Sequence, residues 1–287
     1  MSSAGLKADP RPFKLEYVAI TGADDAVAVD DLNRLARQYP FVEWALLLMP
    51  EAMGQNRFPS ERWIRDFAAR YDGSHKAMHL CGSALLRFIE NDPEILALME
   101  GFSRIQLNLH FGDVAGRIDQ QQLINQIKTH PEFTFVIQYT EADQALLPLL
   151  ADIPNHALLF DGSAGTGVLP AQWPAPISGH QCGYAGGLNP VNLEDNIERI
   201  AAVAGDYKSW IDMESGVRTD DRFDDFLEYR FVFFCRDDFI AVQHILDKLE
   251  IRFIRFARRV KHVMDVCRVI CKTREQESAD RRSQFDD

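Results

Sequence analysis

Two turns made of small residues, each directly after a short apolar segment, are the strongest candidates for chemistry in this sequence. Gly186-Gly187 follows residues 180–185, and Ser215-Gly216 follows residues 209–213. Because small residues carry little or no side chain, the backbone N–H groups of such turns can approach a ligand closely. Two neighbouring turns of this kind, each opening a helix, form a cup for an anion. The pair therefore predicts a phosphate-binding site.

Helix signals follow both turns. Asn189 suits the cap and Pro190 the first position of one helix, and Gly205 suits its end. The triplet Thr219-Asp220-Asp221 suits the cap of another helix. Apolar residues at helical spacing fill the first of these helices, namely Leu193, Ile197, Ile200, Ala201 and Ala204.

Asp161 is the first candidate for proton transfer. It ends the apolar segment 157–160 and begins the loop DGSAGTG, which contains Gly165 and Gly167. Partial burial at a strand end raises the pKa of a carboxyl group towards a range useful in acid–base catalysis. Capping of the glycine loop is the alternative role for this side chain.

Two further side chains, Glu43 and Cys81, are acid–base candidates. Glu43 lies inside the apolar segment Val42–Leu48, so its carboxylate is expected to be paired or to face the interior of the fold. Cys81 ends an apolar segment and precedes a glycine; its thiol is either a base or a small buried side chain. No cysteine or histidine pair has the spacing of a metal site, so the sequence predicts neither a metal nor a cofactor.

The elements that must position these residues are eight short apolar segments that alternate with amphipathic stretches. This alternation is typical of a parallel sheet covered by helices. Eight such units within residues 13–228 predict a single α/β domain, a closed (β/α)8 barrel, in which phosphate usually binds at the loops after strands seven and eight. The expected strands are residues 14–21, 42–48, 77–81, 105–109, 133–138, 157–160, 180–185 and 209–213.

The stretches YAGGLNPVNLEDNI and DMESGV, around the two turns, resemble the last two strand–loop units of phosphoribosylanthranilate isomerase, a (β/α)8 barrel of tryptophan biosynthesis. Weaker similarities run in the same order along the chain, in AITGADDAVAVDDL, NRFPSERW, IQLN and LLFDGSAGTG. The resemblance implies a phosphosugar site built by Gly186, Gly187, Ser215 and Gly216. It also implies that the loop with Gly165 and Gly167 closes over that site.

The resemblance further implies an Amadori rearrangement of an aminoaldose phosphate, an aldose–ketose isomerisation. Asp161 matches the family's general acid, and Arg57 in NRFPS matches the arginine that binds the anthranilate carboxylate. The family's base is a cysteine, and Thr21 stands at that position. A threonine hydroxyl is a far weaker base than a thiolate. Cys81 or Glu43 is a candidate replacement.

Three functions remain open at this point. The first is an isomerase that resembles the family. The second is a phosphosugar-binding barrel with different chemistry, in which Asp161 acts with Glu43 or Cys81. The third is a ligand-binding or interaction protein without catalysis. Thr21 favours the second and third, whereas Asp161 together with Arg57 favours the first or second.

Composition excludes several partners. The chain has 287 residues and a net charge of −12, which argues against a nucleic-acid surface. No apolar run approaches the ~20 residues that a membrane span needs. The five cysteines are sparse and odd in number, so we expect reduced thiols and a cytoplasmic protein. Residues 1–12 are polar and rich in breakers, and are expected to be a disordered leader rather than a signal peptide.

Residues 229–287 differ from the rest of the chain, because they are aromatic and basic with a charge balance of +3. Residues 240–272 fit one amphipathic helix. Packing against the barrel or self-association is the favoured role, and contact with an anionic membrane surface is the alternative. An altered reading frame near the end of the gene would produce the same change in composition.

Overall fold

The computed structural model describes residues 14–223 apart from 113, 164 and 220. The chain divides into two units, residues 1–228 and 229–287. The predicted leader and the predicted C-terminal helix lie outside the described residues. The following description concerns the first unit.

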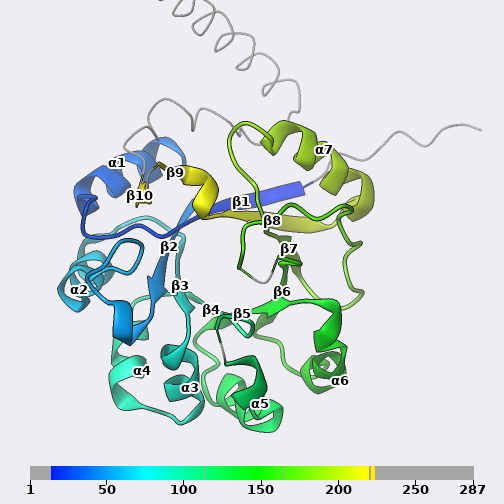
Figure 1. Ribbon diagram of the computed structural model, residues 1–287, viewed down its shortest axis with the longest axis horizontal. Helices are drawn as coiled ribbons and strands as arrows, with labels where there is room; N and C mark the ends of the chain where they lie inside the picture. Colours follow the sequence, from blue (N-terminus) through cyan, green and yellow to red (C-terminus); the bar gives the residue numbers. More distant parts are fainter. Residues whose placement is uncertain (1–13, 113, 164, 220, 224–287) are drawn as a thin grey trace, which may run out of the picture. The chain divides into compact units, whose positions relative to one another are not determined.

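Eight parallel strands form a closed barrel in sequence order, with β8 pairing back onto β1 (Figure 1). The predicted (β/α)8 barrel is therefore confirmed. The strands are β1 (Lys14–Thr21), β2 (Val42–Leu48), β3 (Lys76–Leu80), β4 (Arg104–Leu107), β5 (Thr134–Tyr139), β6 (His156–Phe160), β7 (Cys182–Tyr184) and β8 (Lys208–Met213).

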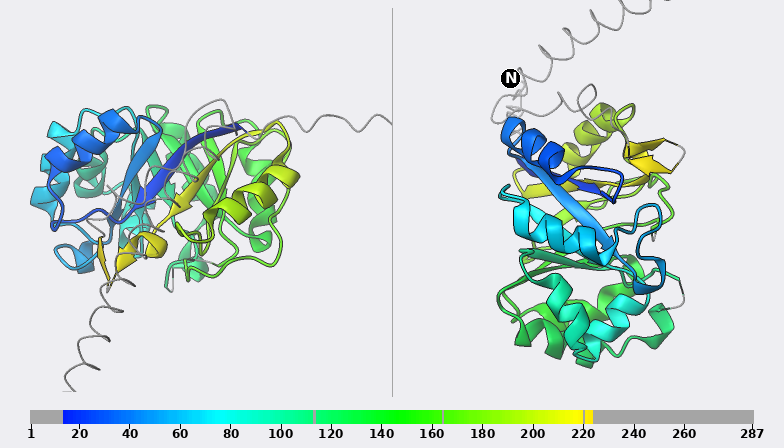
Figure 2. Two further views of the ribbon diagram at one scale, coloured as in Figure 1. Left: turned by 90° about the horizontal axis from the view of Figure 1, so that it is seen from above. Right: turned by 90° about the vertical axis from the view of Figure 1, so that its left-hand side faces the viewer.

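In the described part of the chain, seven α-helices lie around the outside of the strands (Figure 2). Their apolar sides pack inward: α2, for example, buries Ile64 and Phe67 and is capped by the Ser60 hydroxyl, which accepts from the Trp63 N–H. The helices are α1 (Val29–Gln38), α2 (Glu61–Arg70), α3 (Ser83–Ile89), α4 (Pro93–Met99), α5 (Gln120–Thr129), α6 (Leu147–Leu150) and α7 (Leu193–Ala204). Four 3-10 helices are η1 (Pro50–Ala52), η2 (Ala115–Arg117), η3 (Glu141–Leu146) and η4 (Ser215–Val217).

The barrel interior holds both apolar and polar side chains. One apolar cluster consists of Tyr17, Val136, Ala157, Leu159, Ala185 and Trp210. Towards the carboxyl ends of the strands, buried side chains are polar: Thr21, His79, Gln106, Asn108, Gln138, Asp161 and Asp212. Buried polar groups of this kind require partners, and a polar layer at the carboxyl end is where barrel enzymes hold their ligands.

The helix after the first turn begins later than predicted. The sequence predicted a cap at Asn189, but α7 begins at Leu193 with Asn192 at the cap position. Asn189 Oδ1 instead accepts from the N–H groups of Val191 and Asn192, and Asn192 Oδ1 accepts from the Asn189 N–H. The two amide side chains thus stabilise a turn in place of a helical start. Gly205 ends the helix as predicted, with a φ of 61°.

Residues 219–221 were predicted to cap a helix, but Arg222 and Phe223, which follow them, form a strand, and the rest of the predicted helix lies outside the described residues. The single-turn η4 follows β8, and the chain then forms a two-stranded antiparallel hairpin, β9 (Arg218–Thr219) with β10 (Arg222–Phe223). Asp221 adopts a φ of 59° in this hairpin, a conformation that aspartate tolerates better than most residues. The Asp221 side chain accepts a hydrogen bond from Arg57 Nε, and its carbonyl accepts from Arg218 within the hairpin.

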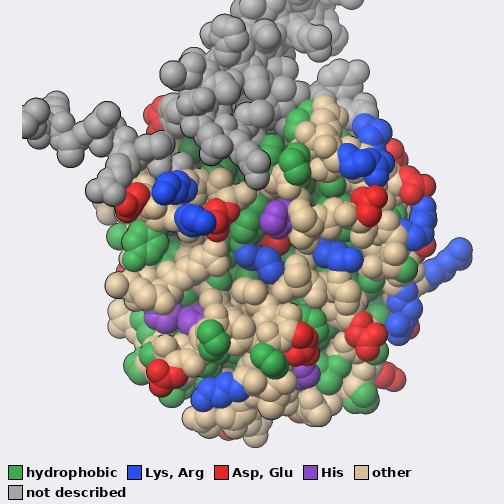
Figure 3. Space-filling model, turned by 180° about the vertical axis from the view of Figure 1, so that it is seen from behind, with side chains coloured by type: hydrophobic (Ala, Val, Ile, Leu, Met, Phe, Trp, Pro, Cys, Tyr) green, Lys and Arg blue, Asp and Glu red, His purple; other side chains and the backbone are tan. Residues whose placement is uncertain are grey.

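The lengths of the helices and the charges on the surface concern two kinds of partner, membranes and charged molecules. None of the helices in the described part of the chain is long and apolar enough to cross a membrane. On the face seen in Figure 3, Lys and Arg side chains are interspersed with Asp and Glu.

Candidate functional site

A cavity of about 240 Å³ lies at the carboxyl ends of β4 to β8. The two small-residue turns and the loop after β6 form one wall of it, and interior polar side chains form the rest. Its lining residues are Gln106, Asn108, Gln138, Leu159, Asp161, Ser163, Gly165, Gly167, Ala185, Gly186, Gly187, Leu188, Asn189, Asp212, Glu214, Ser215 and Gly216. All the predicted phosphate-cup residues and Asp161 thus line one cavity.

Close backbone packing explains the small residues of the two turns. A Cβ atom on Gly187 would lie 2.6 Å from the Leu169 nitrogen, and one on Gly216 would lie 2.2 Å from the Leu188 oxygen. Gly187 also has a φ of 67°, which disfavours any side chain. Within the described residues, no hydrogen bond is donated by the backbone N–H of Gly187 or Gly216. These groups are available to an anion.

Asp161 holds the loop after β6 and lines the cavity at the same time. Its Oδ1 accepts from the Ser163 N–H at 3.2 Å and from the Ser163 hydroxyl at 2.6 Å. Its Oδ2 accepts from Gln138 Nε2 and from the Gly165 N–H, both at 2.8 Å. The alternative role that the sequence allowed, capping of the loop, is therefore present, and it fixes the carboxylate at the cavity wall.

Asp212 is one of the site residues that were not predicted from the sequence. It lies on β8, two residues after the interior Trp210, and lines the cavity. The Thr21 hydroxyl donates a hydrogen bond of 2.6 Å to Asp212 Oδ1. Burial raises the pKa of Asp212 to about 7, although the Thr21 hydrogen bond opposes the shift; the charges of Glu214 and Asp161 add to it. A carboxyl group inside the segment SWIDM, on the same side as Trp210, was the available signal.

Thr21 is not part of the cavity wall. Its side chain is fully buried, and it is absent from the residues that line the cavity. Of Thr21 and Asp161, the two residues that match the family's base and acid positions, only Asp161 faces the cavity directly. Thr21 reaches the site through Asp212.

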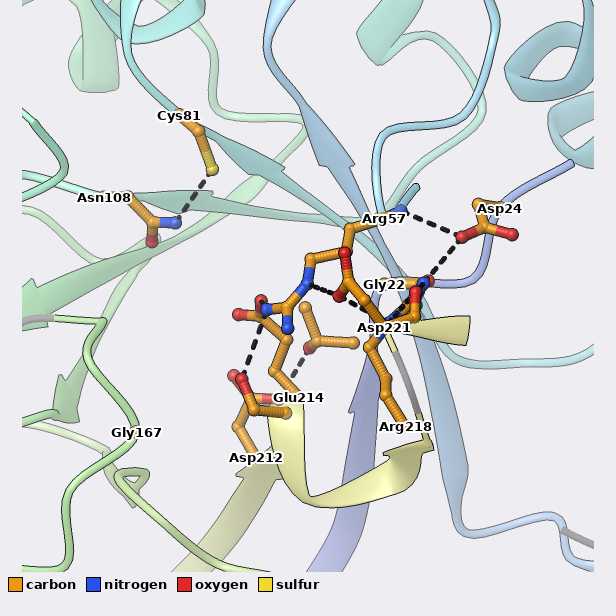
Figure 4. A network of polar contacts seen from close by, with 12 residues as sticks. Gly22, Asp24, Arg57, Cys81, Asn108, Gly167, Asp212, Glu214, Arg218 and Asp221 are labelled. Carbon is orange, nitrogen blue, oxygen red and sulfur yellow. Dashed lines mark hydrogen bonds and ion pairs between the residues drawn. The ribbon is translucent and has the colours of Figure 1, made fainter. Parts of the chain in front are cut away.

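Arg57 is positioned by its backbone as well as by its side chain. Its φ is 73°, and its N–H donates to Asp24 Oδ2 at 2.9 Å. Its guanidinium donates from Nη1 to Glu214 Oε1 at 2.8 Å and from Nε to Asp221 Oδ1 (Figure 4). The side chain predicted to bind a ligand carboxylate is therefore paired with carboxylates of the chain itself.

Arg218 completes this network from the other side. Its side chain is buried and donates from Nη1 to the Gly22 carbonyl at 2.6 Å and from Nη2 to Asp24 Oδ2 at 2.9 Å. Asp24 thus joins Arg218 to the Arg57 backbone, as Figure 4 shows. The loops after β1, β2 and β8 are held together by these contacts, which fixes the position of Arg57.

Glu214 contributes the third carboxylate of the cavity. Its side chain is one-third exposed and meets Arg57 on one side. Burial and the charge of Asp161 raise its pKa, whereas Arg57 and Arg218 lower it. Glu214 lies within the motif DMESGV, but it was not predicted to be a site residue.

Cys81 and Glu43 do not lie in the cavity wall. Cys81 is buried, its Sγ accepts from Asn108 Nδ2 at 3.1 Å, and burial holds the pKa of its thiol far above the usual range. Glu43 faces the interior near the amino ends of the strands, where its Oε2 lies 3.2 Å from Nε of Arg104, the first residue of β4. Arg104 in turn stacks on Tyr17 and Trp210. This placement favours a role for Glu43 inside the barrel rather than at its mouth.

Among the residues that the structure describes, no group of three or more His, Cys, Asp or Glu side chains is arranged to hold a metal ion.

No model of a protein family matches the sequence, and no curated protein matches it. Among solved structures, TrpF from Jonesia denitrificans is 17% identical over 72% of this chain and 90% of its own, with a TM-score of 0.49. Phosphoribosyl anthranilate isomerase from Thermococcus kodakaraensis is 16% identical over 76% and 97%, with a TM-score of 0.46. At such low similarity, the function rests on the site itself.

Proposed function

We propose that the chain binds a phosphorylated sugar derivative at the carboxyl end of the barrel and isomerises it from an aldose to a ketose form. Asp212 and Asp161 act as the pair of proton-transferring groups. The observation that carries the proposal is that both carboxylates line the same small cavity as the two glycine turns. A phosphate in the turns would hold the sugar carbons against the carboxylates.

Asp212 is the general base in this proposal. Thr21 stands where the resembling family has a catalytic cysteine, and its hydroxyl proton is directed at Asp212 Oδ1. The carboxylate therefore takes over the task that the hydroxyl cannot perform. A base with a pKa of about 7 is substantially ionised at neutral pH and still accepts a proton readily.

Asp161 is the general acid. It protonates the ring oxygen of an aminoaldose phosphate, the C1–O bond breaks, and an iminium group forms at C1. Asp212 then removes the proton from C2, which leaves an enaminol; this becomes the ketose when C1 gains a proton and the C2 hydroxyl loses its own. Ser163 supports the acid because a hydroxyl can both donate and accept, so its contact with Asp161 is retained when Asp161 carries the proton.

Amide side chains supply recognition of the sugar. Gln106 in β4, Asn108 directly after β4 and Gln138 in β5 line the cavity. Gln106 Nε2 donates to Asn108 Oδ1, and Gln138 Nε2 donates to Asp161, so the amides are oriented by one another and by the acid. Oriented amides provide both donors and acceptors for hydroxyl groups.

The test is turnover of two aminoaldose phosphates, made from ribose 5-phosphate with anthranilate and with aniline. Ketose formation is followed by NMR for the wild type, D161N and D212N, with D152N as the matched control because Asp152 is exposed and lies outside the cavity. Each site variant should lose about 10²–10⁴-fold in kcat, the usual contribution of a positioned acid or base. Absence of turnover by the wild type on both compounds would reject the isomerase proposal. If either ketose product still bound, a non-catalytic binding protein would remain.

A further inference from the structure

The guanidinium of Arg57 has no complete edge left for an incoming carboxylate. A carboxylate binds arginine in a bidentate manner through Nη2 together with either Nε or Nη1. Asp221 occupies Nε, and Glu214 occupies Nη1 at 2.8 Å, where Ser215 Oγ also lies at 3.2 Å. A bidentate ligand carboxylate must therefore displace one of the two acidic side chains of the chain.

From this geometry we infer that Glu214 is a specificity residue: it fills the carboxylate position on Arg57, so that the site selects phosphosugar derivatives whose other end is uncharged or cationic. The inference rests on the proposed function and names the substrate class of the same site. Derivatives that carry a carboxylate at that end are excluded.

The charges of the cavity support this selection. Asp161, Asp212 and Glu214 all line it, and none of the lining residues is Lys, Arg or His. A ligand carboxylate that displaced Glu214 would leave that side chain without its ion pair, next to two other carboxylates. An unpaired, partly buried charge is costly. An amine or hydroxyl on the ligand can instead donate to these carboxylates while Glu214 keeps its ion pair with Arg57.

The size of the cavity also favours a ligand without an aromatic acid. Its volume of about 240 Å³ lies below the roughly 300–1,000 Å³ typical of pockets for drug-sized ligands. A pentose phosphate with a small substituent is therefore a better match than one that carries a substituted aromatic acid.

Glu214 is also held in place from both sides. It begins the turn that continues into Ser215 and Gly216, and Val217 N–H donates to its carbonyl oxygen. Arg57 is fixed by its own backbone contact with Asp24. Because neither partner depends on the ligand for its position, the ion pair is part of the empty site.

The experiment compares two stable ketose products that differ only in one carboxylate. The probes are 1-phenylamino-1-deoxyribulose 5-phosphate and its 2-carboxyphenyl counterpart, and calorimetry gives the Kd of each. For the wild type, the carboxylate probe should bind at least tenfold more weakly. In E214Q, which removes the charge and keeps the size, the ratio of the two Kd values should fall at least tenfold. E194Q, an exposed position on α7, is the control and should keep the wild-type ratio.

The possible results separate the role of Glu214 from the existence of the phosphosugar site. Tighter binding of the carboxylate probe by the wild type, or an unchanged ratio in E214Q, would overturn the inference while leaving the proposed phosphosugar site intact. Binding of neither probe by the wild type, with a folded protein by circular dichroism, would overturn both. E214S serves as a second variant if E214Q is not folded, and the same fall in the ratio is expected.

Discussion

The Thr21 hydroxyl donates a hydrogen bond of 2.6 Å to Asp212 Oδ1, although the two residues lie 191 positions apart in the chain. The bond joins the end of β1 to β8, the neighbouring strand that closes the barrel. It stabilises the ionised form of Asp212, which burial otherwise disfavours. Thr21 is thus a positioning residue for the proposed base.

Removal of the Thr21 hydroxyl should raise the pKa of Asp212 further. A hydrogen bond to a charged group contributes about 1.5–3 kcal/mol, which corresponds to about one to two pKa units. In T21V the acid limb of the kcat profile, which rises with pH as Asp212 ionises, should therefore move to higher pH by about this amount. T21S keeps the hydroxyl and should keep the wild-type limb. A T21V profile identical to wild type would contradict the role of Thr21.

The stability of the chain should depend on pH through Asp212. Its pKa is about 7 in the folded protein against an ordinary 3.8, so the folded state holds the proton more tightly. The protonated carboxyl group therefore adds to the free energy of unfolding below pH 3.8, and this contribution is lost as the pH rises through about 7. D212N has no carboxyl group at this position and cannot lose the contribution. Its free energy of unfolding relative to wild type should therefore increase by up to about 4 kcal/mol between about pH 4 and pH 8.

Urea unfolding of both proteins across this pH range measures that difference. D152N is the control, and its difference from wild type should stay nearly constant because Asp152 is exposed. If the difference in free energy of unfolding between D212N and wild type were also constant with pH, Asp212 would be ionised in the folded protein at all these pH values.

The two turns should not tolerate a side chain. In G216A the new Cβ would lie 2.2 Å from the Leu188 oxygen, so the backbone of both turns must move apart. We expect inorganic phosphate to raise the Tm of the wild type and to leave the Tm of G216A unchanged. Gly162 is the matched control in the neighbouring loop, because a Cβ there meets nothing within 4 Å, and G162A should keep the effect of phosphate. Equal responses from the two variants would argue against the phosphate cup.

Cys81 should be dispensable for catalysis. Its thiol is buried, bonded to Asn108 and outside the cavity wall, and burial keeps it protonated. C81S retains a hydrogen-bonding group of similar size, so its kcat should stay within about threefold of wild type. A loss comparable to that of a missing general base, about 10²-fold or more, would return Cys81 to the list of catalytic candidates.

The order and type of the barrel elements could be predicted from sequence because each depends on local patterns. Lys14–Thr21 and Val42–Leu48 have the predicted bounds, since turn residues and breakers flank both apolar runs. The start of α7 was not predictable from Asn189 and Pro190 alone. The side chains of Asn189 and Asn192 bond to each other's backbone, and this alternative competes with the helix cap.

The site was predictable only in part, because some of its contacts are local and others join distant parts of the chain. The two small-residue turns and Asp161 can be recognised in the sequence because each follows directly after a strand. The contacts that assign Asp212 and Arg57 their roles join residues 191 and 157 positions apart. Such pairings follow from closure of the barrel and the register of its strands. No local pattern encodes them.

The central claim is that Asp212 removes the C2 proton of a sugar phosphate, and NMR of the reaction in D2O tests it directly. The aniline-derived aminoaldose 5-phosphate is incubated with wild type or D212N, and both the loss of the C2 signal and deuterium at C1 of the ketose are recorded. The wild type should lose the C2 proton and place deuterium at C1, whereas D212N should do neither within the same time. Deuterium incorporation by D212N at the wild-type rate would contradict the account.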